Sequence, residues 1–136
     1  MELYANRTGK FILKLTQTFV FEAAHTLKGR SINVLDKLNS ENIHGHTYHA
    51  SISYEGEVQE DGMVKDFGHI KWAVDAIIRE LDHKFLDNVE DLGRPTMENL
   101  CLFIAKKLSK SDSKLCEVTV ERKATGDKCT YQIKKG

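Results

Sequence analysis

The spacing of apolar residues changes period along this chain, and this change limits the possible folds more than any other feature. Between residues 46 and 58, apolar and polar side chains alternate, which is the period of a half-buried strand. Between 66 and 81, and again between 94 and 108, apolar residues recur at helical spacing. The apolar face of the alternating segment consists of Tyr48, Ala50, Ile52 and Tyr54. The middle of the chain is therefore predicted as a strand followed by two amphipathic helices.

Strands are also predicted toward both ends of the chain. Residues 16–25 are rich in Thr, Phe and Val, and segments 116–123 and 129–135 alternate around the turn sequence ATGD. The resulting order is strand, strand, helix, helix, strand, strand. This order favours an α+β fold, and we expect a four-stranded antiparallel sheet with both helices on one face.

The predicted helices carry residues that helix ends prefer. Asp66 is a predicted N-cap of the first helix, and Pro95 and Thr96 are predicted to start the second. Glu98 in the first turn of the second helix and the two lysines at 106 and 107 in its last turn complement the helix dipole.

Length and composition argue against several classes of protein. The chain has 136 residues, and we interpret residues 1–136 as one domain. Its 20 Lys and Arg balance 20 Asp and Glu, which argues against binding nucleic acid through bulk charge. No apolar run approaches the ~18 residues of a membrane span, and no secretory segment is recognisable, so we expect a cytoplasmic protein. The 3 cysteines form no CxxC pair, so neither a disulfide framework nor a zinc ribbon is indicated.

Three histidines are candidates for a metal site. His44 and His46 are two positions apart, so their side chains point to the same side if a strand begins near His44. Gly45 between them is expected to let the backbone bend. His25 ends the first predicted strand and lies near the same point if the two strands pair as a hairpin. Three imidazoles with one open position suit a catalytic zinc ion, whereas an isolated HxH pair is also typical of loop histidines that form ordinary hydrogen bonds.

Six short motifs together resemble a known family. In chain order they are FEAAHTL, HGHTYH, GMVKDFGHIK, LDHKFLD, PTMEN and VTVER. Their order and approximate spacing are similar to those of the 6-pyruvoyl-tetrahydropterin synthase family, over residues 12–134. Members of that family bind zinc through three histidines, which the resemblance assigns to His25, His44 and His46.

The resemblance also implies a quaternary structure and further site residues. The family uses the T-fold, in which three subunits close a barrel of strands, two trimers stack into a homohexamer, and pterin sites lie between subunits. Glu121 matches the glutamate that anchors the pterin ring, and Thr96 matches a turn that contacts the pterin. Asp82 and His83 match a pair that assists proton transfer. Without the resemblance, all four are also typical of ordinary surface positions.

One departure from the family pattern bears on the reaction. Members that form a pyruvoyl or carboxy product carry a catalytic cysteine shortly before the HxH motif, and the stretch DKLNSENIHGH contains none. Ser40 stands where the carboxy-forming enzymes have it, and Glu41 stands three positions before His44. This ExxHGH arrangement resembles a subclass in which glutamate replaces cysteine. That subclass cleaves the side chain of 7,8-dihydroneopterin triphosphate to give 6-hydroxymethyl-7,8-dihydropterin for folate synthesis.

The chemistry of these side chains favours the same reaction. Pyruvoyl formation needs repeated proton removal from carbon, for which a serine hydroxyl without an adjacent base is too weak. Glutamate, with an ordinary pKa of about 4.3, can relay protons between oxygens, as retro-aldol cleavage requires. Glu41 is therefore the predicted catalytic residue, together with Asp82 and His83, although a solvated loop acid is its ordinary alternative.

Two other functions stay open at the level of sequence, and so does the phosphate site. The motifs also fit a 6-pyruvoyl- or 6-carboxy-tetrahydropterin synthase of the biopterin or queuosine pathway, with a cysteine supplied from elsewhere. A catalytically idle homologue that binds pterin or zinc is the third reading. Candidates for contacting the triphosphate are Lys28, Arg30, Arg94 and Lys123, each equally compatible with ordinary surface charge.

Overall fold

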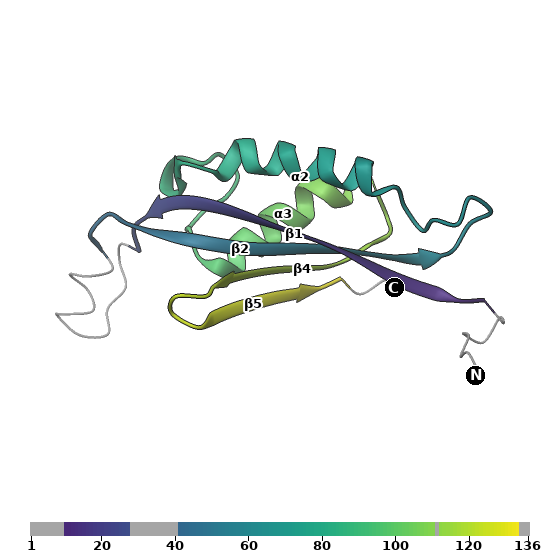
Figure 1. Ribbon diagram of the computed structural model, residues 1–136. Helices are drawn as coiled ribbons and strands as arrows, with labels where there is room; N and C mark the ends of the chain where they lie inside the picture. The colour runs from purple at the N-terminus through teal and green to yellow at the C-terminus, as the bar shows by residue number, and fades with distance from the viewer. Residues whose placement is uncertain (1–9, 28–40, 111, 134–136) are drawn as a thin grey trace.

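A five-stranded sheet in the order β3-β1-β2-β4-β5 organises the computed structural model, which describes residues 10–27, 41–110 and 112–133. The strands are β1 (Ile12–His25), β2 (His44–Glu57), β3 (Lys84–Phe85), β4 (Leu115–Arg122) and β5 (Asp127–Gln132). The helices are α2 (Phe67–Leu81) and α3 (Met97–Ser109), with a short 3-10 helix, η1 (Leu86–Asn88), between them. Figure 1 shows α2 and α3 on one face of the sheet, as the sequence predicted. Within the described ranges, no helix is long and apolar enough to cross a membrane.

The four predicted strands are all present, and β3 is a fifth that the sequence did not reveal. It has 2 residues and pairs in parallel with β1, with Lys84 opposite Ala23. The pairs β1–β2, β2–β4 and β4–β5 are antiparallel, as expected. The prediction of four strands, all antiparallel, was wrong in this detail, because a two-residue strand is too short to show an alternating pattern.

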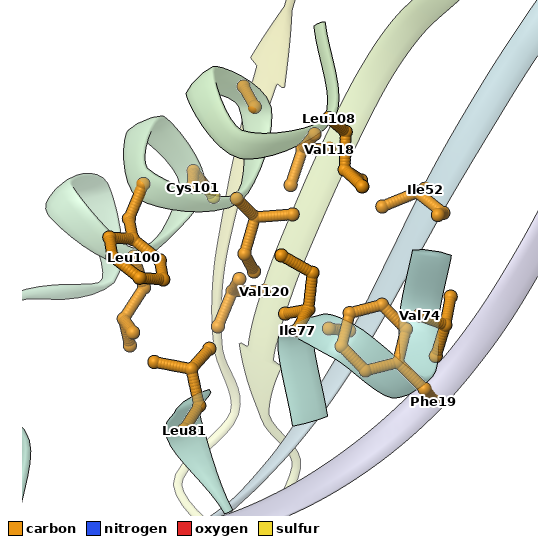
Figure 2. Packing of buried hydrophobic residues seen from close by; sticks show 14 of the residues in the cluster. Phe19, Ile52, Val74, Ile77, Leu81, Leu100, Cys101, Leu108, Val118 and Val120 are labelled. Atoms are coloured by element: carbon orange, nitrogen blue, oxygen red, sulfur yellow. The ribbon is translucent and has the colours of Figure 1, made fainter. Parts of the chain in front are cut away.

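The core lies between the sheet and the two helices. Phe19 and Phe21 of β1 are buried while their neighbours in the strand are exposed, so alternation separates a covered face from an open one. The covered face packs against buried residues of both helices, several of which are labelled in Figure 2. From α2 these are Ile70, Val74, Ile77 and Leu81, and from α3 they include Leu100, Ile104 and Leu108. Each fully buried side chain of this size contributes ~1.5–3 kcal/mol, which holds both helices on this face.

The helix starts are set by side-chain caps. The predicted N-cap of α2 is confirmed, because Asp66 accepts a hydrogen bond from the backbone N–H of Gly68 at 2.7 Å. α3 begins at Met97, later than expected, because Thr96 stays extended and its hydroxyl accepts from the N–H of Asn99 at 3.1 Å. Pro95 therefore lies outside the helix, and its carbonyl is free to bond elsewhere.

Candidate functional site

The three predicted metal ligands come together at one end of β1 and β2. His25 and His44 are directly opposite each other at the last position of the antiparallel register, and His46 is opposite Ala23. All three continue the alternation of the buried side chains, so they project toward the face that the helices cover. The hairpin-like pairing expected from the sequence is thus confirmed, and it brings the three imidazoles together.

Gly45, between two of these histidines, does not bend the chain as expected. The register continues through it without a shift, with Gly45 opposite Ala24. A Cβ at this position would make only an ordinary contact, 3.5 Å from the carbonyl oxygen of Ala23. The regular period of the strand is therefore sufficient to aim both imidazoles at one point.

The nitrogens of the three imidazoles converge. Nε2 of His25 lies 2.9 Å from Nε2 of His44 and 3.1 Å from Nε2 of His46. One ligand nitrogen from each residue lies within 4.8 Å of the others. The rings meet edge to face, with interplanar angles of 69°, 82° and 89°. His25 is 1% exposed whereas His44 and His46 are half-buried, so the cluster stays accessible from one side.

Backbone carbonyls orient two of the rings. Nδ1–H of His25 donates to the Pro95 carbonyl at 2.9 Å, and Nδ1–H of His44 donates to the Asn42 carbonyl at 2.8 Å. A carbonyl can only accept, so the Nε2 atom of each neutral ring carries a lone pair. Two lone pairs 2.9 Å apart repel each other unless a cation lies between them. The donor set therefore fits a divalent ion such as zinc, whose histidine ligands are commonly held by such outer contacts.

Burial favours the neutral form of two of these histidines. Desolvation, partly opposed by the hydrogen bond to Pro95, lowers the pKa of His25 below its usual value. Desolvation and then the positive charge of Arg122 lower the pKa of His46 to about 4. A histidine binds a metal only in its neutral form, so His25 and His46 are ready to do so at neutral pH.

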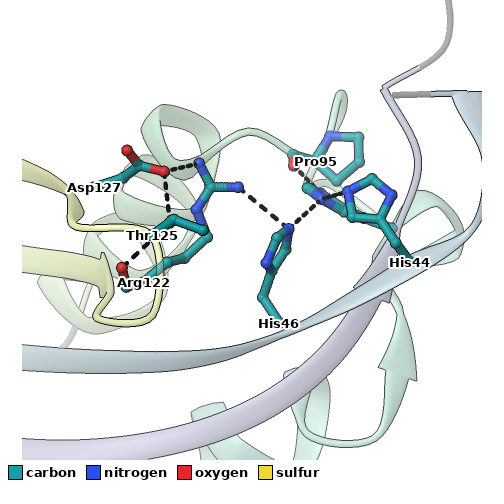
Figure 3. A network of polar contacts seen from close by, with 7 residues as sticks. His44, His46, Pro95, Arg122, Thr125 and Asp127 are labelled. Atoms are coloured by element: carbon teal, nitrogen blue, oxygen red, sulfur yellow. Dashed lines mark hydrogen bonds and ion pairs between the residues drawn. The ribbon is translucent and has the colours of Figure 1, made fainter. Parts of the chain in front are cut away.

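Arg122, the last residue of β4, reaches the cluster although the sequence analysis did not select it. Nη1 of Arg122 donates to Nε2 of His46 at 3.3 Å, and Nη2 donates to the carboxylate of Asp127 at 2.6 Å. The hydroxyl of Thr125 donates to the same carboxylate oxygen at 2.8 Å, and Figure 3 shows the whole network. The sequence contained one indication of this position. Arg122 is two residues after the core residue Val120, so in a strand both side chains project to the same face.

The Asp82–His83 pair lies at the edge of the sheet. Asp82 accepts from the N–H of Glu22 at 2.9 Å, and the N–H of His83 donates to the Glu22 carbonyl at 2.6 Å. Asp82 also lies 3.0 Å from Nδ1 of His83, and the Glu22 bond followed by this contact lowers the pKa of Asp82. Glu22 precedes His25 by three residues, roughly 10 Å along β1. Within the described residues, no hydrogen bond or ion pair joins this pair to the three histidines, although His83 and His46 line the same cavity.

Neither of the two predicted substrate-binding residues forms a hydrogen bond with the cluster within the described chain. Glu121 is opposite His49, and it faces the open side of the sheet because the adjacent Val120 is buried on the covered side. Thr96 follows Pro95 directly, and its hydroxyl is engaged as the cap of α3. A single chain therefore does not gather all the predicted site residues into one pocket.

Glu41 is half-buried and is the first described residue after the segment 28–40. The next residue in the chain is Asn42, whose backbone carbonyl orients His44. Of the other residues considered from the sequence, Ser40, Lys28 and Arg30 lie outside the described residues. Arg94 and Lys123 are exposed, and Lys123 follows Arg122 in the chain.

The fold and the cluster define a class of protein, namely T-fold proteins with three histidines at the end of two long paired strands. Residues 14–134 match the family described as 6-pyruvoyl tetrahydropterin synthase. The chain belongs to this family, whose members are enzymes of pterin metabolism. The family predicted from the six motifs is confirmed.

Three proteins illustrate what the chain is similar to in sequence and in fold. It is 36% identical over 91 residues to a dihydroneopterin monophosphate aldolase of Pyrococcus furiosus, which covers 67% of this chain and 70% of that protein. The structure of Caenorhabditis elegans 6-pyruvoyl tetrahydropterin synthase superposes with a TM-score of 0.77 at 28% identity, over 90% of this chain and 96% of that one. A Plasmodium vivax 6-pyruvoyltetrahydropterin synthase, described as a catalytic residue mutant with glutamate replaced by alanine, superposes with a TM-score of 0.69 at 22% identity, over 90% and 99%. These structures confirm the predicted T-fold.

We expect the metal-free protein to lose stability as the pH falls from 6.5 toward 4. The pKa of His46 is about 4 in the folded protein against 6.5 for a free histidine. The unfolded chain therefore takes up this proton first, and unfolding becomes more favourable through this window. Thermal unfolding of chelator-treated protein measures the effect. In the variant His46→Gln, the unfolding temperature is expected to fall less steeply between these pH values. An unchanged slope would contradict the lowered pKa of His46.

The His44→Ala variant is expected to lose bound zinc, because two remaining imidazoles rarely hold the ion. The matched control is His49→Ala, which removes a histidine from the same strand but from the opposite face. Atomic absorption on dialysed protein measures the zinc content. Full zinc retention in His44→Ala, or loss in His49→Ala, would show that the ligands are misassigned.

Proposed function

We propose that this protein is a zinc-dependent lyase that converts 7,8-dihydroneopterin triphosphate to 6-hydroxymethyl-7,8-dihydropterin, a step in folate synthesis. The observation that carries the proposal is the convergence of three imidazole nitrogens close in sequence to Glu41, in a stretch without cysteine. The name of the Pyrococcus furiosus relative, a dihydroneopterin monophosphate aldolase, supports cleavage of a phosphorylated dihydroneopterin. Because that name refers to a monophosphate, the number of phosphates is part of the test.

The proposed reaction breaks the bond between C1′ and C2′ of the pterin side chain. The 2′-hydroxyl loses its proton as C2′ becomes a carbonyl, and the electrons of the broken bond pass into the C6–N5 imine of the ring. C1′ then takes up a proton, which gives the hydroxymethyl product and a phosphorylated glycolaldehyde. The reaction needs no oxidant or reductant. The protein must supply a base for the 2′-oxygen and an acid for C1′.

His25, His44 and His46 are the residues that would hold zinc. Bound zinc supplies Lewis acidity, which makes nearby hydroxyl groups easier to deprotonate. The carbonyls of Pro95 and Asn42 keep two of the rings in their ligating orientation. His44 and His46 are only half-buried, so substrate oxygens would approach the cluster from their side.

Glu41 is proposed as the group that takes and returns the proton. Glu41 is the neighbour in the chain of Asn42, whose backbone carbonyl accepts a hydrogen bond from the ring of His44. A carboxylate can accept a proton from one oxygen and deliver it again. The Plasmodium vivax protein with this fold is described as having a catalytic glutamate, which is consistent with such a role.

We propose that the remaining residues act across subunit boundaries in a homohexamer formed by two trimers. Within one chain, Asp82 and His83 are bonded to Glu22 at the sheet edge, and Glu121 faces away from the helices. In the assembly expected for the T-fold, Asp82 and His83 assist proton transfer. Glu121 accepts two parallel hydrogen bonds from the amino–imino edge of the pterin. In the same proposal, Thr96 belongs to the turn that contacts the pterin.

The alternative function is 6-pyruvoyl-tetrahydropterin synthesis, which the name of the Caenorhabditis elegans structure favours. Within one chain, the thiols of Cys101 and Cys116 argue against it. Cys101 donates to the carbonyl of Cys129, and Cys116 donates to the carbonyl of Ser53. Cys116 precedes Arg122 by six residues, roughly 20 Å along β4, so it does not take the place of a cysteine beside the histidines within the chain.

Product analysis tests the proposal directly. Zinc-loaded protein is incubated separately with 7,8-dihydroneopterin triphosphate and with the monophosphate, and the pterin product is identified by mass spectrometry. We expect 6-hydroxymethyl-7,8-dihydropterin. A pyruvoyl or carboxy product would replace the proposal with a synthase function, and untouched substrate would indicate a binding protein.

The Glu41→Ala variant is expected to lose turnover by about 10²–10⁴-fold, the usual contribution of a general base, with its zinc retained. Glu60→Ala, which removes an exposed acid from a turn, is the matched control and is expected to behave as the unmodified protein. Initial rates and zinc content are measured on the same preparations. Normal turnover in Glu41→Ala would rule out the catalytic assignment.

A further inference from the structure

The guanidinium of Arg122 has donors that the described part of the chain leaves largely unused. Its side chain is 21% exposed, and Nη2 forms an ion pair with Asp127 at 2.6 Å. Nη1 donates to Nε2 of His46 at 3.3 Å, and the buried Nε has no hydrogen-bond partner among the described residues. Figure 3 shows the guanidinium between Asp127 and His46. A buried donor without an acceptor is costly, and in native proteins a ligand or a water usually satisfies it.

The acceptor on the cluster side does not stay available when a metal is bound. Nε2 of His46 has one lone pair, and a ligating nitrogen uses that lone pair for the metal. Nη1 of Arg122 then lies at the cluster without this acceptor. The guanidinium keeps its place all the same, because Asp127 retains the ion pair and is itself held by Thr125 at 2.8 Å.

An anion with several oxygens suits this position. A guanidinium presents N–H donors in a fixed fork that matches phosphate geometry, and it stays charged at every relevant pH. Arg122 and a divalent ion at the histidines together outweigh the single charge of Asp127, which favours a dianion over a neutral hydroxyl. In the proposed substrate, the phosphate ester is on C3′, directly beside the carbon whose hydroxyl is deprotonated. A group 3.3 Å from a ligating nitrogen is therefore well placed to meet that phosphate.

We propose that Arg122 binds the phosphate on C3′ of the substrate and thereby selects phosphorylated over phosphate-free dihydroneopterin. The identity of this phosphate rests on the proposed function, whereas an anion site beside the histidines does not depend on which pterin product is made. Two other roles are conceivable from the same contacts. In the first alternative, Arg122 only holds the β4–β5 turn in place through Asp127. In the second, it contacts the reacting oxygens on C1′ and C2′.

Equilibrium binding separates these roles without relying on turnover. Oxidised neopterin, neopterin monophosphate and neopterin triphosphate fluoresce, and their aromatic ring resists side-chain cleavage. Each is titrated into zinc-loaded protein, and zinc content is measured alongside. We expect Arg122→Gln to weaken binding of both phosphorylated forms by roughly 10- to 100-fold, which is the usual value of a charged hydrogen bond, and to leave phosphate-free neopterin unaffected.

Three further variants serve as controls. Lys123→Gln removes a positive charge from the next residue, which is exposed, and is expected to leave the affinity for all three neopterins nearly unchanged. Asp127→Asn breaks the ion pair but keeps the guanidinium, so it should retain most of the preference for phosphate. Arg122→Lys keeps a point charge without the fork, and an intermediate affinity for the phosphorylated forms is expected even if Arg122→Gln proves unstable.

The outcomes decide between the roles. Equal affinity of Arg122→Gln and unmodified protein for neopterin monophosphate would overturn the proposal. So would a similar loss of affinity for phosphate-free neopterin, which would indicate contact with C1′ and C2′ oxygens. A loss in Asp127→Asn as large as in Arg122→Gln would indicate a purely structural tie. An unexpected pterin product from the turnover assay would reject the proposed lyase function and leave this binding result standing.

Discussion

β1 and β2 pair over all 14 residues of each strand, from Ile12 opposite Glu57 to His25 opposite His44, and the candidate site depends on this pairing. Side chains alternate between faces with a period of two, so a slip of one residue would move a whole set to the other face. The buried aromatic residues Phe21 and Tyr48 oppose such a slip because they would become exposed. The same packing that stabilises the sheet therefore also holds the three candidate ligand histidines together on its covered face.

The helical layer contributes to the site through a backbone atom. The cap formed by Thr96 starts α3 one residue after Pro95, and this leaves the Pro95 carbonyl outside the helix to accept from His25. His25 is 1% exposed, and the hydrogen bond from its Nδ1–H to this carbonyl fixes its tautomer. Packing of α3 through Leu100 and Ile104 consequently fixes the orientation of a candidate metal ligand, His25, on another element.

The neutral state of the cluster and the charge of Arg122 are linked. Desolvation and the nearby guanidinium both favour neutral His46, which is the form that a metal needs. Asp127 holds the guanidinium on its far side through an ion pair, which keeps the guanidinium beside His46. The anion site proposed for Arg122 agrees with a phosphorylated pterin as the proposed substrate.

The sequence by itself determined what depends on local periods and on short motifs. It predicted the main strands, the two helices, the Asp66 cap, the common side of His44 and His46, and the family. Only the tertiary structure decided the rest, namely β3, the Pro95 carbonyl on His25, the contact of Arg122 with His46, and the attachment of Asp82 to Glu22. The physical reason is sequence distance: the partners of His25 and His46 lie 70 and 76 positions away, and sheet order and helix packing bring them together. A period of two or 3.6 residues describes one element at a time and contains no information about which elements become neighbours.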